Sequence, residues 1–237
     1  VRALAAANTP GLAKELLAEE RWRGYSPAIR GAVLSALLAR PDYHPGVLSM
    51  VECDVVPKGA IPAVQREQWL KSGDAVTRSR AGKLFQPPGD RMLAYQSARA
   101  SLSLNASAEN GRQVFLRLCA GCHRLERDGH AVGPDLFDIR NQPKESILLH
   151  IVLPEQEVAA AFTAYVCETQ DGRTLTGLLA AESPGAVTLR QAQGLEETVP
   201  RSQIKSLVAS PLSLMPQELE KGMTLQEMAD LLAYLDR

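Results

Sequence analysis

Two cysteines and a histidine lie close together at Cys119, Cys122 and His123, within the stretch CAGCHRLERDGHAVGPDL. Thiols at this spacing can form a disulfide, a zinc site, a redox-active dithiol or the attachment point of a c-type heme. The order C-x-x-C-H favours the heme. Both thiols can add to the two vinyl groups on one edge of the porphyrin, and the residue that follows can offer an imidazole to the iron. We therefore predict one covalently bound heme c on Cys119 and Cys122, with His123 as an iron ligand.

The other three kinds of site fit the sequence less well. A disulfide requires no histidine after the second cysteine. A redox-active dithiol of the thioredoxin type would follow a strand, whereas the residues before Cys119 have a helical pattern. Zinc needs four ligands, and only His130 offers a third at a sensible spacing. These sites remain the alternatives to a heme.

Two further residues are candidates for the same site. A histidine that binds a metal almost always donates its other N–H to an acceptor, and the carbonyl of Pro134 is the candidate here; the alternative is that VGPDL is only a turn. Met215, in the loop sequence SLMP, is the candidate second iron ligand, because such a loop can approach the face opposite His123. The alternative for a lone methionine is a place in the core. We expect that place for the remaining methionines, which are Met50, Met92, Met223 and Met228.

Residues 1–87 have the pattern of short amphipathic helices separated by proline and glycine. The clearest is SPAIRGAVLSALLAR, with Ser26 as a candidate N-cap and Pro27 in the first turn. DAVTRSRAGKLF has Asp74 as a possible cap. Helix pairs of this kind predict a short α-solenoid, and a plain helical bundle is the alternative. The expected apolar stripe of the clearest helix consists of Ile29, Val33, Leu34, Leu37 and Leu38.

A boundary is expected at QPPGD, followed by a linker helix within residues 88–106. The next helix, with Ser107 as its N-cap, should lead directly to Cys119. The last segment, TLQEMADLLAYLDR, should be a helix that begins with a capping box of Thr224 and Glu227.

Between about 163 and 209 the pattern changes from helical to alternating. The turn sequences DG, SPGA and AQG separate about four short segments, which predicts an antiparallel β meander. The predicted fold class is therefore mainly α with a β insertion (α+β). A helical solenoid would precede a domain whose β meander separates His123 from Met215.

The charges nearly balance, with 26 Lys and Arg against 27 Asp and Glu. This balance gives no electrostatic case for nucleic acid as a partner. No apolar run reaches the ~18 residues that a membrane helix needs. The chain begins VRALAAANTPGLAKELL, without an initiating Met, a basic start or a signal-type apolar core, so we expect it to be a piece of a longer chain.

Residues 107–237 resemble a class I cytochrome c and, more narrowly, the heme-binding domain of planctomycete and verrucomicrobial type. The resemblance is carried by GRQVFLRLCAGCH, GHAVGPDL, YVCETQDGRTLTGLLAAES, VTLRQAQGLEETVPRSQI and SLMPQELEKGMTLQEMADLLAYL. It implies that Cys119 and Cys122 carry the heme, that His123 and Met215 are its axial ligands, and that the strands are an insertion between them.

The same resemblance implies that the first and last helices of the domain cross, with Gly111, Phe115 and Tyr234 at the crossing. In that family the domain often follows a sugar-dehydrogenase-like propeller and a HEAT-like helical region. Residues 1–87 are similar, though more weakly, to the end of such a region.

These features favour an electron-transfer module rather than an enzyme. Its expected partners are redox proteins or an upstream dehydrogenase domain, and its expected location is periplasmic or otherwise outside the cytoplasm, where heme c is attached. The first alternative is a heme enzyme, such as a peroxidase, or a gas sensor, which needs an open or labile sixth site. The second is a scaffold in which the heme is only structural.

Two cysteines remain, Cys53 and Cys167. An oxidising compartment permits a disulfide between them. The alternatives are two separate buried thiols and an intermolecular bridge.

Overall fold

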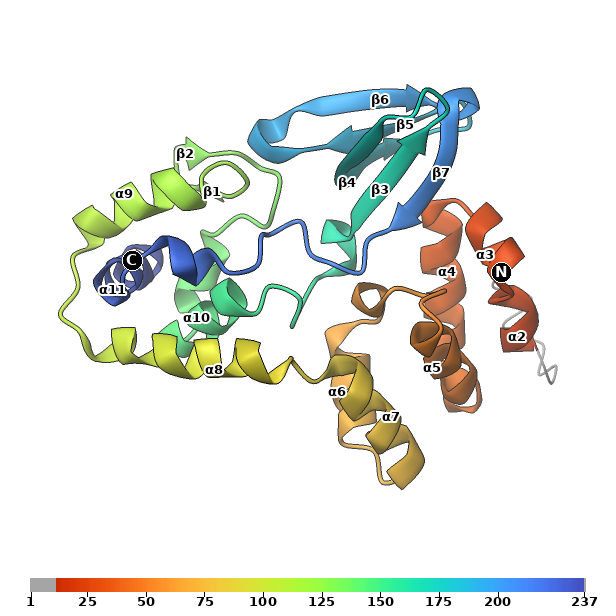
Figure 1. The fold of residues 1–237 in the computed structure, drawn as a ribbon, viewed down its shortest axis with the longest axis horizontal. Helices are drawn as coiled ribbons and strands as arrows, with labels where there is room; N and C mark the ends of the chain where they lie inside the picture. Colours follow the sequence, from red (N-terminus) through yellow and green to blue (C-terminus); the bar gives the residue numbers. More distant parts are fainter. Residues whose placement is uncertain (1–11, 237) are drawn as a thin grey trace.

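The computed structural model describes residues 12–236 and contains two groups of helices, a five-stranded β-sheet and a two-stranded ribbon of β1 (Arg124–Leu125) and β2 (Asp128–Gly129). In Figure 1 the N-terminal helices lie on the right, the sheet lies above, and the helices that flank the C-x-x-C-H motif lie on the left. The fold class is α+β, as predicted.

The N-terminal group of helices follows the caps expected from the sequence. The Ser26 hydroxyl accepts a hydrogen bond from the N–H of Ile29, and the Asp74 carboxylate accepts from the N–H groups of Val76 and Thr77. Neighbouring helices pack on one another around a shared apolar core. The helices are α2 (Leu12–Leu16), α3 (Glu19–Gly24), α4 (Pro27–Leu38), α5 (His44–Glu52), α6 (Ala63–Leu70) and α7 (Ala75–Phe85).

The apolar stripe expected for α4 is wrong at its first residue, Ile29. Ile29 is 43% exposed, whereas its neighbour Arg30 is 6% exposed. The Arg30 guanidinium donates to the carbonyls of Trp22, Arg23 and Leu207. These three acceptors offset the cost of burying a charged group, so the helix presents Arg30 rather than Ile29 to the interior.

Three buried arginines connect the first half of the chain to the second through backbone carbonyls. Arg30 reaches Leu207 in the sheet, and Arg66 of α6 donates to the carbonyls of two residues just after the helix α10 (Lys144–Val152). Arg91 donates to the carbonyl of Val152 and forms an ion pair with Glu220. Arg91 lies in the expected linker helix, which is α8 (Gly89–Ala98) followed by a 3-10 turn (Arg99–Ser103).

The helices α9 (Ala108–Leu118) and α11 (Leu225–Leu235) cross at Gly111. A Cβ on Gly111 would lie 1.9 Å from the carbonyl oxygen of Asp230, so only glycine permits this approach. The rings of Phe115 and Tyr234 are 5.6 Å apart beside it. The crossing therefore uses the residues that the resemblance implied.

Each of the crossing helices has the cap expected from its sequence. The Ser107 hydroxyl accepts from the N–H of Asn110, and Thr224 and Glu227 form the complete capping box. In addition, the buried Asp230 carboxylate accepts a hydrogen bond of 2.8 Å from the N–H of Ser107. This bond joins the start of α9 to the middle of α11.

The sheet has five strands in the order β6-β5-β4-β3-β7, all antiparallel. The four expected strands form the predicted meander, but the fifth strand was missed. This strand, β7, follows β6 in the sequence but lies at the opposite edge of the sheet, where it pairs with β3 and places Leu207 beside Cys167. The strands are β3 (Ala164–Thr169), β4 (Thr174–Glu182), β5 (Ala186–Arg190), β6 (Glu196–Pro200) and β7 (Ile204–Ala209).

Cys53 and Cys167 are both free thiols in the structure. Cys167 is fully buried in the core of the sheet, as expected for a small apolar residue. Cys53 is exposed and follows the last residue of α5, so the expectation of a buried thiol holds for Cys167 and is wrong for Cys53.

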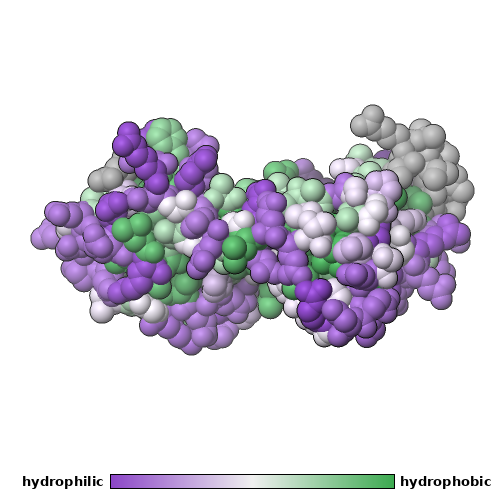
Figure 2. Space-filling view, turned by 90° about the horizontal axis from the view of Figure 1, so that it is seen from above, coloured by the Kyte–Doolittle hydropathy of each residue, from purple (hydrophilic) through white to green (hydrophobic). Residues whose placement is uncertain are grey.

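Within residues 12–236, no helix combines the length and apolar character needed to cross a membrane. Figure 2 shows one face of the molecule, on which hydrophilic residues predominate and hydrophobic residues form small separate patches.

Replacing Gly111 with alanine should separate α9 from α11, because the new methyl group would overlap the Asp230 carbonyl. We expect a loss of about 3 kcal/mol in the free energy of unfolding, at the upper end of the usual cost of overpacking. Urea unfolding followed by circular dichroism measures it.

Gly31→Ala is the matched control, since Gly31 lies within α4 and a Cβ there would meet nothing within 4 Å. This change should stabilise the protein by about 0.5–1 kcal/mol, because glycine is unfavourable inside a helix. Equal stability of the two variants would contradict the assigned role of Gly111.

Candidate heme-binding site

The C-x-x-C-H motif begins where α9 ends. Cys119 is the C-terminal cap of α9, and its N–H donates to the Phe115 carbonyl. The chain then turns tightly, so that the N–H groups of Cys122 and His123 both donate to the Cys119 carbonyl at 3.0 and 2.9 Å. This turn brings both thiols and the imidazole to one cavity.

The His123 ring is positioned by Gly133 and Pro134 in the segment that follows it. Its Nδ1 lies 2.8 Å from the carbonyl oxygen of Pro134 and must donate to it, because a carbonyl only accepts. Nε2 is then the unprotonated nitrogen of the neutral ring. A Cβ on Gly133 would lie 2.7 Å from Cε1 of the ring, so glycine is needed where the chain passes the imidazole.

Burial lowers the pKa of His123, and the hydrogen bond to Pro134 opposes this shift only in part. The neutral ring, with a lone pair on Nε2, is the form that binds a metal. The hydrogen bond expected from the sequence thus fixes both the tautomer and the direction of the ring.

The cavity beside this histidine has a volume of about 480 Å³, which lies in the usual range of cofactor sites. Both cysteines, His123 and Met215 line it, and the rest of its wall is mainly apolar. The apolar part of the wall includes Leu118, Val132, Leu136, Ile139, Ile147, Ile151, Phe162, Leu178, Leu214 and Leu219. An apolar cavity with two thiols, an imidazole and a thioether on its wall fits a c-type heme.

The two thiols lack the properties of a redox pair or of zinc ligands. Burial, and then the proximity of Cys122, raises the pKa of Cys119 to about 12, and burial also raises the pKa of Cys122. Reactive cysteines show the opposite shift. No group of three or more His, Cys, Asp or Glu side chains suited to a metal ion occurs among residues 12–236. The zinc alternative and the thioredoxin-like alternative therefore lose their support.

Met215 reaches the cavity from the loop that joins β7 to α11. The loop begins with a hydrogen bond from the N–H of Ser210 to the Ala164 carbonyl, next to the sheet. The N–H of Met215 donates to the hydroxyl of Ser213, which forms a tight local turn. Met215 is half-buried and packs against the same apolar cluster as α9 and α11.

If Met215 is not the second ligand, the remaining candidates are His150, His130 and Met223, and of these His150 lines the cavity. His150 of α10 lines the cavity, with Nε2 3.9 Å from a carboxylate oxygen of Glu157. His130 is exposed, and Met223 packs in the core around α11 without lining the cavity.

Sequence reasoning missed the part of the wall that the sheet supplies. Val132, Leu178 and Ala164 are buried together, with Cys122 and Phe162 packed against them. The only signal for this contact in the sequence was the apolar side of the alternating pattern in β4, which does not say what the strand faces.

Part of the chain is similar to known cytochromes c. It is 34% identical over 55 residues to a "Cytochrome c-553-like" protein of Synechocystis sp., a match that covers 23% of this chain and 51% of that protein. It is 43% identical over 47 residues to a "Cytochrome c homolog" of Rickettsia bellii, covering 19% of this chain and 27% of the homolog. The match to the Rickettsia felis homolog has the same identity and covers 26% of that protein.

The chain thus spans about half the length of the Synechocystis relative and about a quarter of the Rickettsia relatives. No family model matches the chain. These similarities support a cytochrome c-like domain.

Replacing Gly133 with alanine should displace the His123 ring and weaken its bond to Pro134. The steric conflict predicts a cost of about 1–3 kcal/mol. The fraction of protein that carries covalent heme, produced together with the attachment machinery, should fall several-fold. Gly185→Ala is the control, since its Cβ would meet nothing within 4 Å and its heme content should not change. Full heme content in Gly133→Ala would show that the position of the His123 ring does not limit heme attachment.

Proposed function

We propose that this protein transfers electrons through one covalently bound heme c, attached to Cys119 and Cys122, with His123 and Met215 as axial ligands. The observation that carries the proposal is that all four side chains line one and the same apolar cavity. When bound, the heme supplies a one-electron couple between ferric and ferrous iron.

The residues around the cavity would set the properties of this couple. The Pro134 carbonyl keeps Nε2 of His123 unprotonated by accepting a hydrogen bond from Nδ1–H, which holds the proton on Nδ1. A methionine ligand raises the reduction potential relative to a second histidine. The apolar wall lowers the local dielectric and excludes water, which also raises the potential. Ligands on both faces would leave no open position for a substrate, which favours electron transfer over a peroxidase-like enzyme or a gas sensor.

In this proposal residues 107–237 form a cytochrome c domain of planctomycete and verrucomicrobial type, with the strands inserted between the two ligand segments. Residues 1–87 form a HEAT-like region, and residues 88–106 link the two. An upstream dehydrogenase domain, or a separate redox protein, would exchange electrons with the heme. The packing of neighbouring N-terminal helices on one another supports the HEAT-like interpretation.

The protein would work in the periplasm or elsewhere outside the cytoplasm, because heme c is attached there. Production in the cytoplasm without the attachment machinery should yield colourless, poorly folded protein, since the apolar cavity would lack its cofactor. Absorption spectra and circular dichroism of the purified product test this, and protein made in the periplasm with the machinery is the control. Red, folded holoprotein from the cytoplasm would contradict it.

Met215→Ala should open the sixth position of the iron. Carbon monoxide should then bind the ferrous protein readily, the potential should fall, and the weak charge-transfer band of the ferric protein that marks methionine ligation should disappear. His123→Ala should reduce heme incorporation as well as change the spectrum. Optical titration in an electrochemical cell measures the reduction potential and the ferric band of each variant.

Met223→Ala is the matched control, since Met223 is also partly buried in the cluster around α11 but does not line the cavity. It should keep the ferric band and the potential. If Met215→Ala also left both unchanged, another residue would be the ligand, and His150, His130 and Met223 would be tested in that order. A ferric wild-type protein without the band would favour the heme enzyme or gas sensor instead.

A further inference from the structure

The backbone carbonyls of residues 119–122 all accept hydrogen bonds. For three of them the donors are N–H groups of the same segment, no farther along the chain than Gly133. Gly121 is the exception. Its carbonyl accepts a hydrogen bond of 2.6 Å from the N–H of Gln193, which lies in the turn between β5 and β6. A residue of the inserted sheet thus completes the bonding of the heme-attachment loop.

The sheet tip, defined here as residues 191–195, has a backbone shaped for this contact. Gln193 and Gly194 both have positive φ, at 61° and 72°. The hairpin closes through a bond from Gln191 N–H to the Leu195 carbonyl, and the Gln193 N–H takes no part in it. A glutamine in the left-handed region is unfavourable without compensation, and the bond to Gly121 supplies that compensation.

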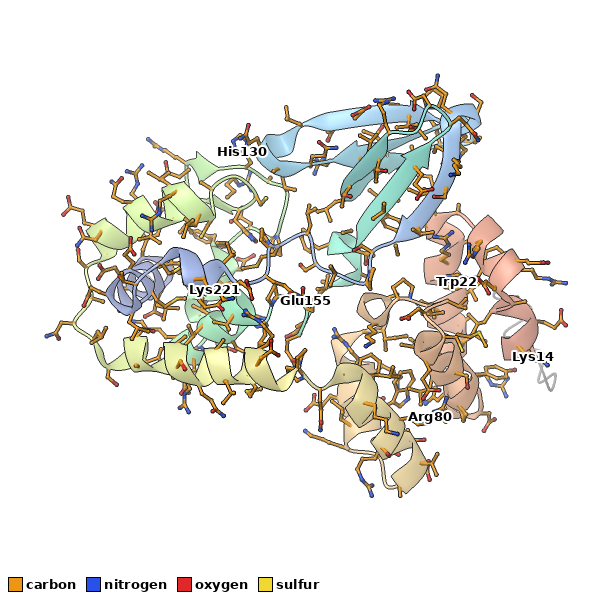
Figure 3. All side chains as sticks on the ribbon, viewed as in Figure 1. Lys14, Trp22, Arg80, His130, Glu155 and Lys221 are labelled. Atoms are coloured by element: carbon orange, nitrogen blue, oxygen red, sulfur yellow. The ribbon has the colours of Figure 1, made fainter. Side chains whose placement is uncertain are left out.

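Further contacts extend from the tip along the attachment segment. Figure 3 shows His130 beside the tip, and a Cβ on Gly194 would lie 3.8 Å from Nδ1 of that ring. The Arg190 guanidinium donates to the Ala131 carbonyl at 3.4 Å. Beyond it, Val132 is 2% exposed and Leu178 of β4 is 6% exposed, and both belong to the buried cluster against which Cys122 packs.

We infer that the inserted sheet is a fixed lid on the Cys122 side of the heme cavity. The Gln193 N–H positions the attachment loop through Gly121, and Leu178 of β4, which lines the cavity, keeps water from the side of the cavity near Cys122. Exclusion of water disfavours the more highly charged ferric state, so the lid raises the reduction potential. This inference rests on the proposed function, and it assigns the insertion a part in tuning the same site.

The decisive variant replaces residues 191–195 with Asn-Gly, a two-residue turn that can join Arg190 to Glu196, which already pair across the hairpin. In the holoprotein, amide hydrogen exchange in residues 119–133 should become about tenfold faster, as expected when a hydrogen bond is lost. The potential should fall below that of the wild type while the ferric band of methionine ligation remains. Gln193→Gly is the control, because it keeps the N–H and suits a positive φ, and it should match the wild type in both measurements.

Wild-type exchange and potential in the shortened protein would overturn the inference. Faster exchange at an unchanged potential would also overturn it, since the sheet would then only stabilise the loop. A second test needs no variant: in wild-type holoprotein the Gln193 amide should exchange slowly, and exchange at the rate of an open turn would overturn the inference even if the shortened protein failed to fold. A wild-type protein without covalent heme or methionine ligation would instead contradict the proposed function.

Discussion

The contact between the backbones of α9 and α11 at Gly111 is the constraint on which the heme cavity depends. It fixes the direction of α9, and the end of α9 determines where Cys119 and the turn after it lie. It also fixes α11, whose apolar face forms the core beneath the cavity. The hydrogen bond from the N–H of Ser107 to the buried Asp230 carboxylate joins the two helices at a second point.

Much of the site could be predicted because the residues that form it lie close together in the sequence. The spacing of Cys119, Cys122 and His123, and the short distance to Pro134, contain nearly all the information needed to form the turn and to orient the imidazole. The helix caps at Ser26, Asp74, Ser107 and the Thr224 box were predictable for the same reason: each cap depends on residues within one helical turn.

The features that were missed depend on contacts between distant parts of the chain. The strand β7 has no strong alternating pattern, and its pairing with β3 follows from the crossing of the chain over the sheet. Burial of Arg30 in place of Ile29 depends on three carbonyls whose positions no helical period reveals. Likewise, the bond between Gln193 and Gly121 joins two turns that are adjacent only after the sheet has folded.

The three arginines that join the halves of the chain have an evolutionary consequence. Arg30, Arg66 and Arg91 all reach main-chain oxygens in the second half, and every residue type provides such an oxygen. Apart from Glu220, whose carboxylate pairs with Arg91, the side chains at the accepting positions can therefore drift while the junction persists, whereas each guanidinium has no equivalent substitute. Selection on this junction should fall mainly on the three arginines and Glu220, so the sheet could diversify in sequence without detaching from its helical support.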